Sequence, residues 1–155
     1  MNKEQKNIFA PILVVEDNPD HARMIIRTLK KKSNLMNEII HFSNGQEVLD
    51  YFFKMKDEEN SDQPNPILIL LDVKMPIKNG FEVLEGIRAE KKCLNIPIVM
   101  LTTTANSEDV AKALKLGAND YIVKPLKYDE FTEKIAKLGY YWGVISDTKK
   151  AINDN

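Results

Sequence analysis

Short apolar runs alternate along the chain with longer segments in which apolar residues recur at helical spacing. The apolar runs occupy residues 11–15, 38–42, 66–71, 97–101 and 120–124. Three of them (PILVV, PILILL and PIVML) are continuously apolar, which is typical of strands buried on both faces of a parallel sheet. EIIHF and DYIVK are weaker strand candidates. The pattern therefore predicts a parallel sheet of five strands.

The intervening segments are expected to be helices. Asn18-Pro19-Asp20 supplies an N-cap, a proline for the first turn and an early acid, and it precedes the amphipathic segment HARMIIRTLKKK. Further helices are predicted to start at Asn44-Gly45 and to span residues 81–91, 107–117 and 128–142. The helix that starts at Ser107 is expected to end at Gly117 in a left-handed C-cap.

Five successive βα units predict a doubly wound α/β fold, because parallel strands need crossover helices and these crossovers are right-handed. The polar, turn-rich residues 54–66 (KMKDEENSDQPNP) are expected to form an extended loop after the second helix. We expect one domain over residues 10–145, preceded by an N-terminal extension (1–9) and followed by a flexible tail (146–155). In such folds the ligand site lies beyond the carboxyl ends of the strands.

Composition restricts the kind of protein and its cellular compartment, but it does not indicate which reaction or ligand the protein serves. The formal net charge of −1 provides no basic field of the kind that nucleic-acid binding requires. The single cysteine, Cys93, excludes an internal disulfide and is consistent with a reducing compartment. The N-terminal residues lack the core of a signal peptide, and no apolar run approaches the roughly 20 residues of a membrane helix. We therefore expect a cytoplasmic domain that binds neither nucleic acid nor membrane.

Chemically useful side chains follow the predicted strands. Glu16 and Asp17 come directly after the first strand and Asp72 after the third, while Thr102 ends the fourth and Lys124 the fifth. Clustered carboxylates repel one another unless a hard divalent cation lies among them, and Mg²⁺ prefers oxygen ligands. A carboxylate at such a site can attack a phosphoryl donor while the metal and a lysine neutralise charge. The pattern is therefore compatible with Mg²⁺-dependent phosphoryl transfer.

Four motifs resemble the receiver domain of two-component response regulators: ILVVEDN, LLDVKMPIKNG, VMLTT and GANDYIVKP. They occur in the family's order over roughly residues 10–142. The resemblance implies a flavodoxin-like sheet of order 2-1-3-4-5 and an aspartate that a histidine kinase phosphorylates. The loop 54–66 and the aromatic residues 140–142 also give a less specific resemblance to single-domain regulators that act with phytochrome-type or other hybrid sensor kinases.

The resemblance assigns the metal site by position. It implies that Asp72 is the phosphoacceptor and a metal ligand, and that Asp17 binds Mg²⁺ directly. Glu16, where the family more often has aspartate, would hold the metal mostly through water. Lys74 would contribute its backbone carbonyl, so its side chain matters little there.

The resemblance also assigns the groups that respond to phosphorylation. Thr102 would be the switch hydroxyl that moves toward the phosphoryl group, and Lys124 would pair with the phosphoryl oxygens. Tyr121 matches the aromatic residue that turns inward as Thr102 moves. The family usually has a cis peptide at the position of Lys124-Pro125.

Several functions remain open from the residues. The first is a single-domain response regulator that signals to a downstream protein target by phosphorylation-dependent interaction. No segment beyond Ser146 is long enough for a DNA-binding module, so we expect output by protein contact. The alternative is a phosphorelay intermediate that passes the phosphoryl group to a histidine phosphotransfer protein. A pseudo-receiver scaffold would be expected to lack the site residues, which are all present. In each case we expect only self-phosphorylation and self-dephosphorylation, not turnover of a substrate.

A haloacid-dehalogenase-type phosphatase is disfavoured, because such enzymes need a second aspartate where Lys74 stands. His21 and His41 are expected to be surface or packing residues away from the carboxylates. A homodimer through the aromatic residues of the last helix is a further expectation.

Overall fold

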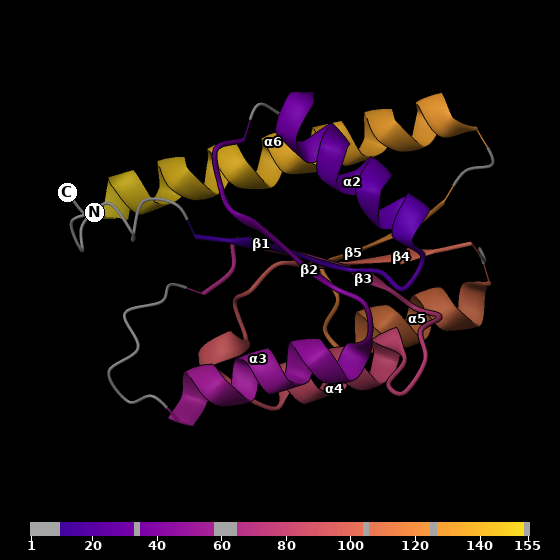
Figure 1. Ribbon diagram of the computed structural model, residues 1–155. Helices are drawn as coiled ribbons and strands as arrows, with labels where there is room; N and C mark the ends of the chain where they lie inside the picture. Colours follow the sequence, from indigo (N-terminus) through magenta and orange to yellow (C-terminus); the bar gives the residue numbers. More distant parts are fainter. Residues whose placement is uncertain (1–9, 33–34, 58–64, 104–105, 125–126, 154–155) are drawn as a thin grey trace.

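Five parallel strands form one sheet, and helices cover both of its faces (Figure 1). The computed structural model describes residues 10–32, 35–57, 65–103, 106–124 and 127–153, without the side chains of 55–57 and 143–153. The strands are β1 (Ile12–Val15), β2 (Ile39–Phe42), β3 (Leu68–Asp72), β4 (Ile98–Thr102) and β5 (Asp120–Val123). Their order is β2-β1-β3-β4-β5, with every neighbouring pair parallel. The predicted fold class and strand order are confirmed.

The helices divide into two layers. Figure 1 shows α2 (Pro19–Lys31) and α6 (Tyr128–Asn153) together on one face of the sheet. The other face carries α3 (Gly45–Asp57), α4 (Gly80–Arg88) and α5 (Ser107–Lys115). A short 3₁₀ helix, η1 (Lys91–Cys93), follows α4. Within the described ranges, no helix is long and apolar enough to cross a membrane.

The two faces of the sheet bury separate hydrophobic clusters, and this explains the uninterrupted apolar runs. In β1, Leu13 and Val15 pack into the cluster beneath α3, α4 and α5. Ile12 and Val14 alternate with them and pack into the cluster beneath α2 and α6. Because both faces of the strand are covered, every position of β1 must be apolar.

Local capping places the first helix immediately after the first strand. The side chain of Asn18 accepts hydrogen bonds from the backbone N–H groups of Asp20 (2.9 Å) and His21 (3.1 Å). Helix α2 therefore begins at Pro19, two residues beyond Asp17, and its first turn lies at the carboxyl edge of the sheet. At the end of α5, Gly117 has a φ of 106°, as the predicted left-handed C-cap requires.

The ends of α3, α4 and α6 differ from the sequence prediction, and α4 ends at Arg88 rather than at residue 91. Helix α3 continues through Asp57, so the extended loop does not begin at residue 54 as predicted, and residues 58–64 lie outside the described residues. Helix α6 continues to Asn153, so its predicted end at Trp142 is wrong. Residues 146–153, which were expected to be a frayed tail, are helical. The predicted N-terminal extension (1–9) and the peptide bond before Pro125, for which the resemblance implied a cis conformation, lie outside the described residues.

Candidate functional site

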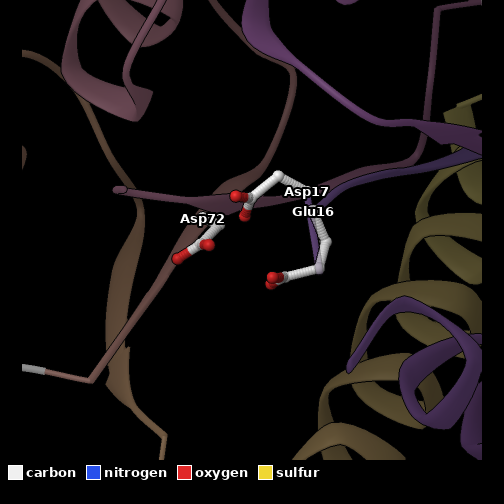
Figure 2. Close-up of side chains that lie close together, drawn as sticks. All are labelled: Glu16, Asp17 and Asp72. Atoms are coloured by element: carbon white, nitrogen blue, oxygen red, sulfur yellow. The ribbon is translucent and has the colours of Figure 1, made fainter. Parts of the chain in front are cut away.

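Three carboxylates gather at the carboxyl edge of the sheet, at its centre (Figure 2). Asp72 is the last residue of β3, and Glu16 and Asp17 directly follow β1. Strands β1 and β3 are parallel neighbours, so the residues at their carboxyl ends emerge at the same edge. One oxygen from each carboxylate lies within 4.8 Å of the other two. The structure thus brings together the acidic residues that lie far apart in the sequence.

Burial and mutual repulsion make this cluster electrostatically unfavourable as it stands. Glu16 is 1% exposed and Asp72 is 6% exposed, whereas Asp17 faces solvent. Burial, followed by the charge of Glu16, raises the pKa of Asp72 from 3.8 to about 7, although Lys124 acts in the opposite direction. An added positive charge would relieve this strain.

The donor set fits a divalent cation. All three groups offer carboxylate oxygens, the ligands that hard cations such as Mg²⁺ and Mn²⁺ prefer. The exposed Asp17 also lines a cavity of about 440 Å³ together with Lys74, so the cluster is open to solvent on the side of Asp17. The acidic cluster therefore has the composition, the crowding and the access that a divalent-cation site needs.

Lys124 supplies a buried ammonium group to the same edge. Its Nζ donates to Glu16 Oε2 at 2.6 Å and lies 3.7 Å from Asp72 Oδ1. Lys124 follows β5, and its backbone N–H donates to the carbonyl of Thr102 at the end of β4. The ammonium thus lies between two of the three carboxylates and is closer to Glu16 than to Asp72.

The remaining predicted residues lie on β4, on β5 and in the segment after β3. Thr102 is buried at the end of β4, and its neighbour Leu101 pairs with Asp72 in the sheet. Tyr121 pairs with a methionine of β4 and is half-buried against the core beneath α3, α4 and α5. Lys74 is exposed in the segment that follows β3. The roles that the resemblance assigned to these residues stay predictions.

The expectation that the histidines lie away from the carboxylates is wrong for His21, whereas His41 contacts the backbone of Glu16. His41 Nε2 is 2.8 Å from the backbone oxygen of Glu16, and because a carbonyl only accepts, this ring nitrogen carries the proton. His21 Nδ1 lies 3.7 Å from Glu16 Oε1 and 3.3 Å from Lys124 Nζ.

The physical reason for both contacts is tertiary. His41 lies on β2, next to β1, and His21 occupies the first turn of α2, just after the acidic pair. His41 could have been located from the sequence only by predicting that the apolar run 38–42 pairs with the run 11–15. The N-cap at Asn18 could have placed His21 at the strand edge, because it starts α2 beside the acidic pair.

Comparison with known proteins identifies relatives of this arrangement. A family model described as the response regulator receiver domain matches residues 12–136. Response regulator Rcp1 of Synechocystis is 33% identical over 139 residues, which are 90% of this chain and 92% of Rcp1. A chemotaxis protein CheY homologue of Campylobacter jejuni is 34% identical over 124 residues, which are 80% of this chain and 88% of that protein.

Solved structures agree with the sequence relatives. The crystal structure of the Mn²⁺-bound form of Rcp1 has a TM-score of 0.76 and 32% identity, covering 86% of this chain and 94% of that one. The phosphorylated cyanobacterial phytochrome response regulator RcpA has a TM-score of 0.77 and 30% identity, with the same coverage of 86% and 94%. The similarity thus extends over nearly the whole of both chains.

Proposed function

Because the chain belongs to the response regulator receiver domain family, we propose that it works as a single-domain response regulator with Asp72 as its phosphoacceptor. The observation that carries the proposal is the placement of Asp72. One oxygen of its buried carboxylate lies within 4.8 Å of a carboxylate oxygen of Glu16 and of one of Asp17. Its Oδ1 also lies 3.7 Å from the Nζ of Lys124. The chain matches 92% of the length of response regulator Rcp1, and this supports the single-domain interpretation.

In the proposed reaction, the phosphodonor is the phosphohistidine of a sensor histidine kinase. A carboxylate oxygen of Asp72 attacks the phosphorus and the P–N bond of the donor breaks. The imidazole nitrogen keeps the electron pair and takes up a proton, and Asp72 becomes an acyl phosphate. The ionised form of Asp72 is the nucleophile, so a cation beside it increases the reactive fraction.

The chain's own residues would hold and orient the groups that react. We propose that Asp17, Asp72 and the backbone carbonyl of Lys74 bind Mg²⁺, with Glu16 acting mostly through water. Bound Mg²⁺ would supply positive charge to the phosphoryl oxygens. Lys124 can reach those oxygens by a small shift, because its Nζ already lies 3.7 Å from Asp72.

The response to phosphorylation follows from the added charge, which is about −2. Thr102, buried beside the acceptor, would donate its hydroxyl to a phosphoryl oxygen, and the half-buried Tyr121 would turn inward as Thr102 moves. Such a shift biases a two-state surface that a downstream protein reads. Autodephosphorylation by water would return the protein to its resting state.

Incubation with Mg²⁺ and the small donor phosphoramidate tests this function. The wild-type protein should gain the mass of one phosphoryl group, and EDTA or Asp72→Asn should prevent the gain. Asp50→Asn is a matched control, because it removes an exposed carboxylate of α3 that is outside the cluster. A wild-type protein that gains no mass under these conditions contradicts the proposal.

The proposed phosphodonor is a sensor histidine kinase of the phytochrome or hybrid type, in the cytoplasm. The name of the relative RcpA, a phytochrome response regulator, supports this choice. Profiling phosphotransfer from every histidine kinase of the same cell would test it. A preference for kinases without a phytochrome module would contradict the phytochrome assignment.

A relay role is the alternative. It predicts that a purified histidine phosphotransfer protein removes the phosphoryl group from Asp72 within minutes and appears phosphorylated on histidine. A terminal regulator would keep its phosphoryl group in that mixture. A phosphatase of the haloacid-dehalogenase type stays disfavoured, because Lys74 stands where its second aspartate would be.

We also propose a homodimer through α6. Tyr140 and Tyr141 are 63% and 50% exposed, whereas Trp142 is half-buried and packs against the core beneath α2 and α6. Exposed aromatic side chains are typical of interfaces. Light scattering should give a dimer mass that Tyr140→Ser/Tyr141→Ser reduces to the monomer mass. An unchanged mass in this variant would exclude α6 as the interface.

A further inference from the structure

A second concave surface lies beside the edge of the sheet, between α2 and β2. It has a volume of about 540 Å³, and Pro19, Ala22 and Ile26 of α2 form its apolar part, with His41 of β2 at its border. Strand β2 is the last strand on this side of the sheet. None of the three clustered carboxylates lines this surface, so it is distinct from the proposed phosphorylation site. We call this surface the α2–β2 groove. It is lined by Pro19, Ala22, Arg23, Ile26, Arg27, Lys30, Lys31 and His41.

Four cationic side chains surround the apolar part of the groove: Arg23, Arg27, Lys30 and Lys31. All four are exposed, and within the described ranges none of them has an ion-pair partner. Lys32 points elsewhere and donates to a threonine of α6 at 3.3 Å. The chain as a whole has a formal charge of −1, so this concentration of positive charge is local.

The fold itself does not require this arrangement. Lys30 and Lys31 lie in the last turn of α2, where the helix dipole favours cations. Arg23 and Arg27 lie earlier in α2, however, and like charges four residues apart repel each other. Arg27 and Lys31 repeat the same unfavourable spacing. Negative charges on a bound partner would attract these cations and so offset the repulsion between them.

We propose that the α2–β2 groove docks an acidic amphipathic segment of a partner protein. The apolar side chains of that segment would cover Pro19 and Ile26, and its carboxylates would pair with the surrounding cations. Arg23 to Lys31 spans about 12 Å along the helix axis at 1.5 Å per residue, which is longer than one phosphate group can bridge. Several carboxylates spaced along a peptide match this length, and arginine binds carboxylates in a bidentate manner.

The groove also adjoins the phosphorylation site. His41, at the border of the groove, donates to the backbone carbonyl of Glu16. A segment bound there would therefore lie one hydrogen bond away from a residue of the acidic cluster. The docking inference does not depend on phosphorylation, so its test uses the unmodified protein.

Fluorescence anisotropy with a synthetic helical peptide tests the inference. The probe carries leucines on one face and glutamates on the others, and a second probe has glutamine in place of every glutamate. The wild-type protein should bind the glutamate probe, more weakly as salt rises, and should bind the glutamine probe at least about tenfold more weakly. Arg23→Glu/Arg27→Glu should weaken binding of the glutamate probe by more than about tenfold.

Lys91→Glu/Lys92→Glu is the matched control. It makes the same change in net charge at two exposed lysines of η1, which follows α4 and lies with the helices of the opposite face. This variant should keep the affinity within about twofold of the wild type. Circular dichroism and urea midpoints establish that both variants are folded, so that a loss of binding reflects the groove.

Four results would overturn the inference. The wild type could fail to bind the glutamate probe, or both double variants could weaken it equally, which would mean that only net charge matters. Inorganic phosphate could displace the probe at equal concentration, which would indicate a small-anion site. The free protein could instead form a dimer that Arg23→Glu/Arg27→Glu dissociates, which would make a second copy the occupant.

Discussion

Replacing Asp72 by asparagine should make the metal-free protein more stable at pH 8. In the wild type, Asp72 is buried near Glu16, and burial together with this charge raises its pKa to about 7. An unfolded chain releases the same proton near pH 4. At pH 8 the group is ionised in both states, and only the folded state bears the cost of a buried charge. Asparagine has nearly the same shape and removes that charge.

The size of the effect follows from the shift in pKa. A rise from 3.8 to about 7 is roughly three units, each worth about 1.4 kcal/mol, so the upper limit is about 4 kcal/mol. Solvent at the edge of the sheet screens part of this energy, and the asparagine amide will not satisfy every hydrogen bond, so we expect a gain of about 1–3 kcal/mol.

The raised pKa of Asp72 also determines whether the stability of the wild type rises or falls with pH. Between about pH 4 and pH 7 the folded protein holds a proton on Asp72 that the unfolded chain has lost, so wild-type stability falls as pH rises through this window. The advantage of Asp72→Asn should therefore be largest at pH 8 and should shrink toward pH 5.

Urea unfolding in EDTA at pH 5 and pH 8 measures this difference, because titrating groups that do not interact with Asp72 cancel between the two proteins. Asp17→Asn serves as the control, since it removes one charge from the same cluster at an exposed position and should gain less. If Asp72→Asn is no more stable than the wild type at pH 8, the proposed strain at this carboxylate is refuted.

Three further predictions concern the same edge of the sheet. Mg²⁺ should raise the unfolding free energy of the wild type, by about 2.7 kcal/mol at one hundred times the dissociation constant, and calorimetry of Asp17→Asn should show little of this rise. Lys124→Met should cost about 3–5 kcal/mol in urea unfolding, because it leaves Glu16 buried without its 2.6 Å partner; a smaller loss with Lys124→Arg is the internal control. Gly80→Ala should cost about 1–3 kcal/mol and slow phosphoryl uptake, because its methyl group would collide with the backbone oxygen of Asp72. At Gly86 the same change meets only a flexible leucine and should be nearly neutral, so equal effects at both glycines would contradict this account.

The central part of the site could be predicted from the sequence because its position depends only on strand ends. An apolar run that stops at Glu16-Asp17 and another that stops at Asp72 must bring these residues to one edge if the strands are parallel neighbours. No detailed side-chain geometry is needed for that conclusion. The same logic applies to Lys124, which follows β5.

The two histidines and the α2–β2 groove could not be predicted in this way. His41 contacts Glu16 only because β2 pairs with β1, and a short run at the edge of the sheet carries little information about its neighbour. Arg23 and Arg27 look like ordinary surface residues until the structure shows that, in the part of the chain it describes, neither makes an ion pair. The end of α6 was missed because residues 146–153 lack the apolar spacing by which a helix is identified.

The central claim is that Asp72 itself carries the phosphoryl group, and borohydride trapping tests it most directly. An acyl phosphate on aspartate is reduced to homoserine, which peptide mass spectrometry locates in the chain. After incubation with phosphoramidate and Mg²⁺, homoserine should be found at position 72 and should be absent when EDTA is present. Homoserine at Asp17 instead of Asp72, or a phosphoryl group that borohydride leaves in place, would contradict the account.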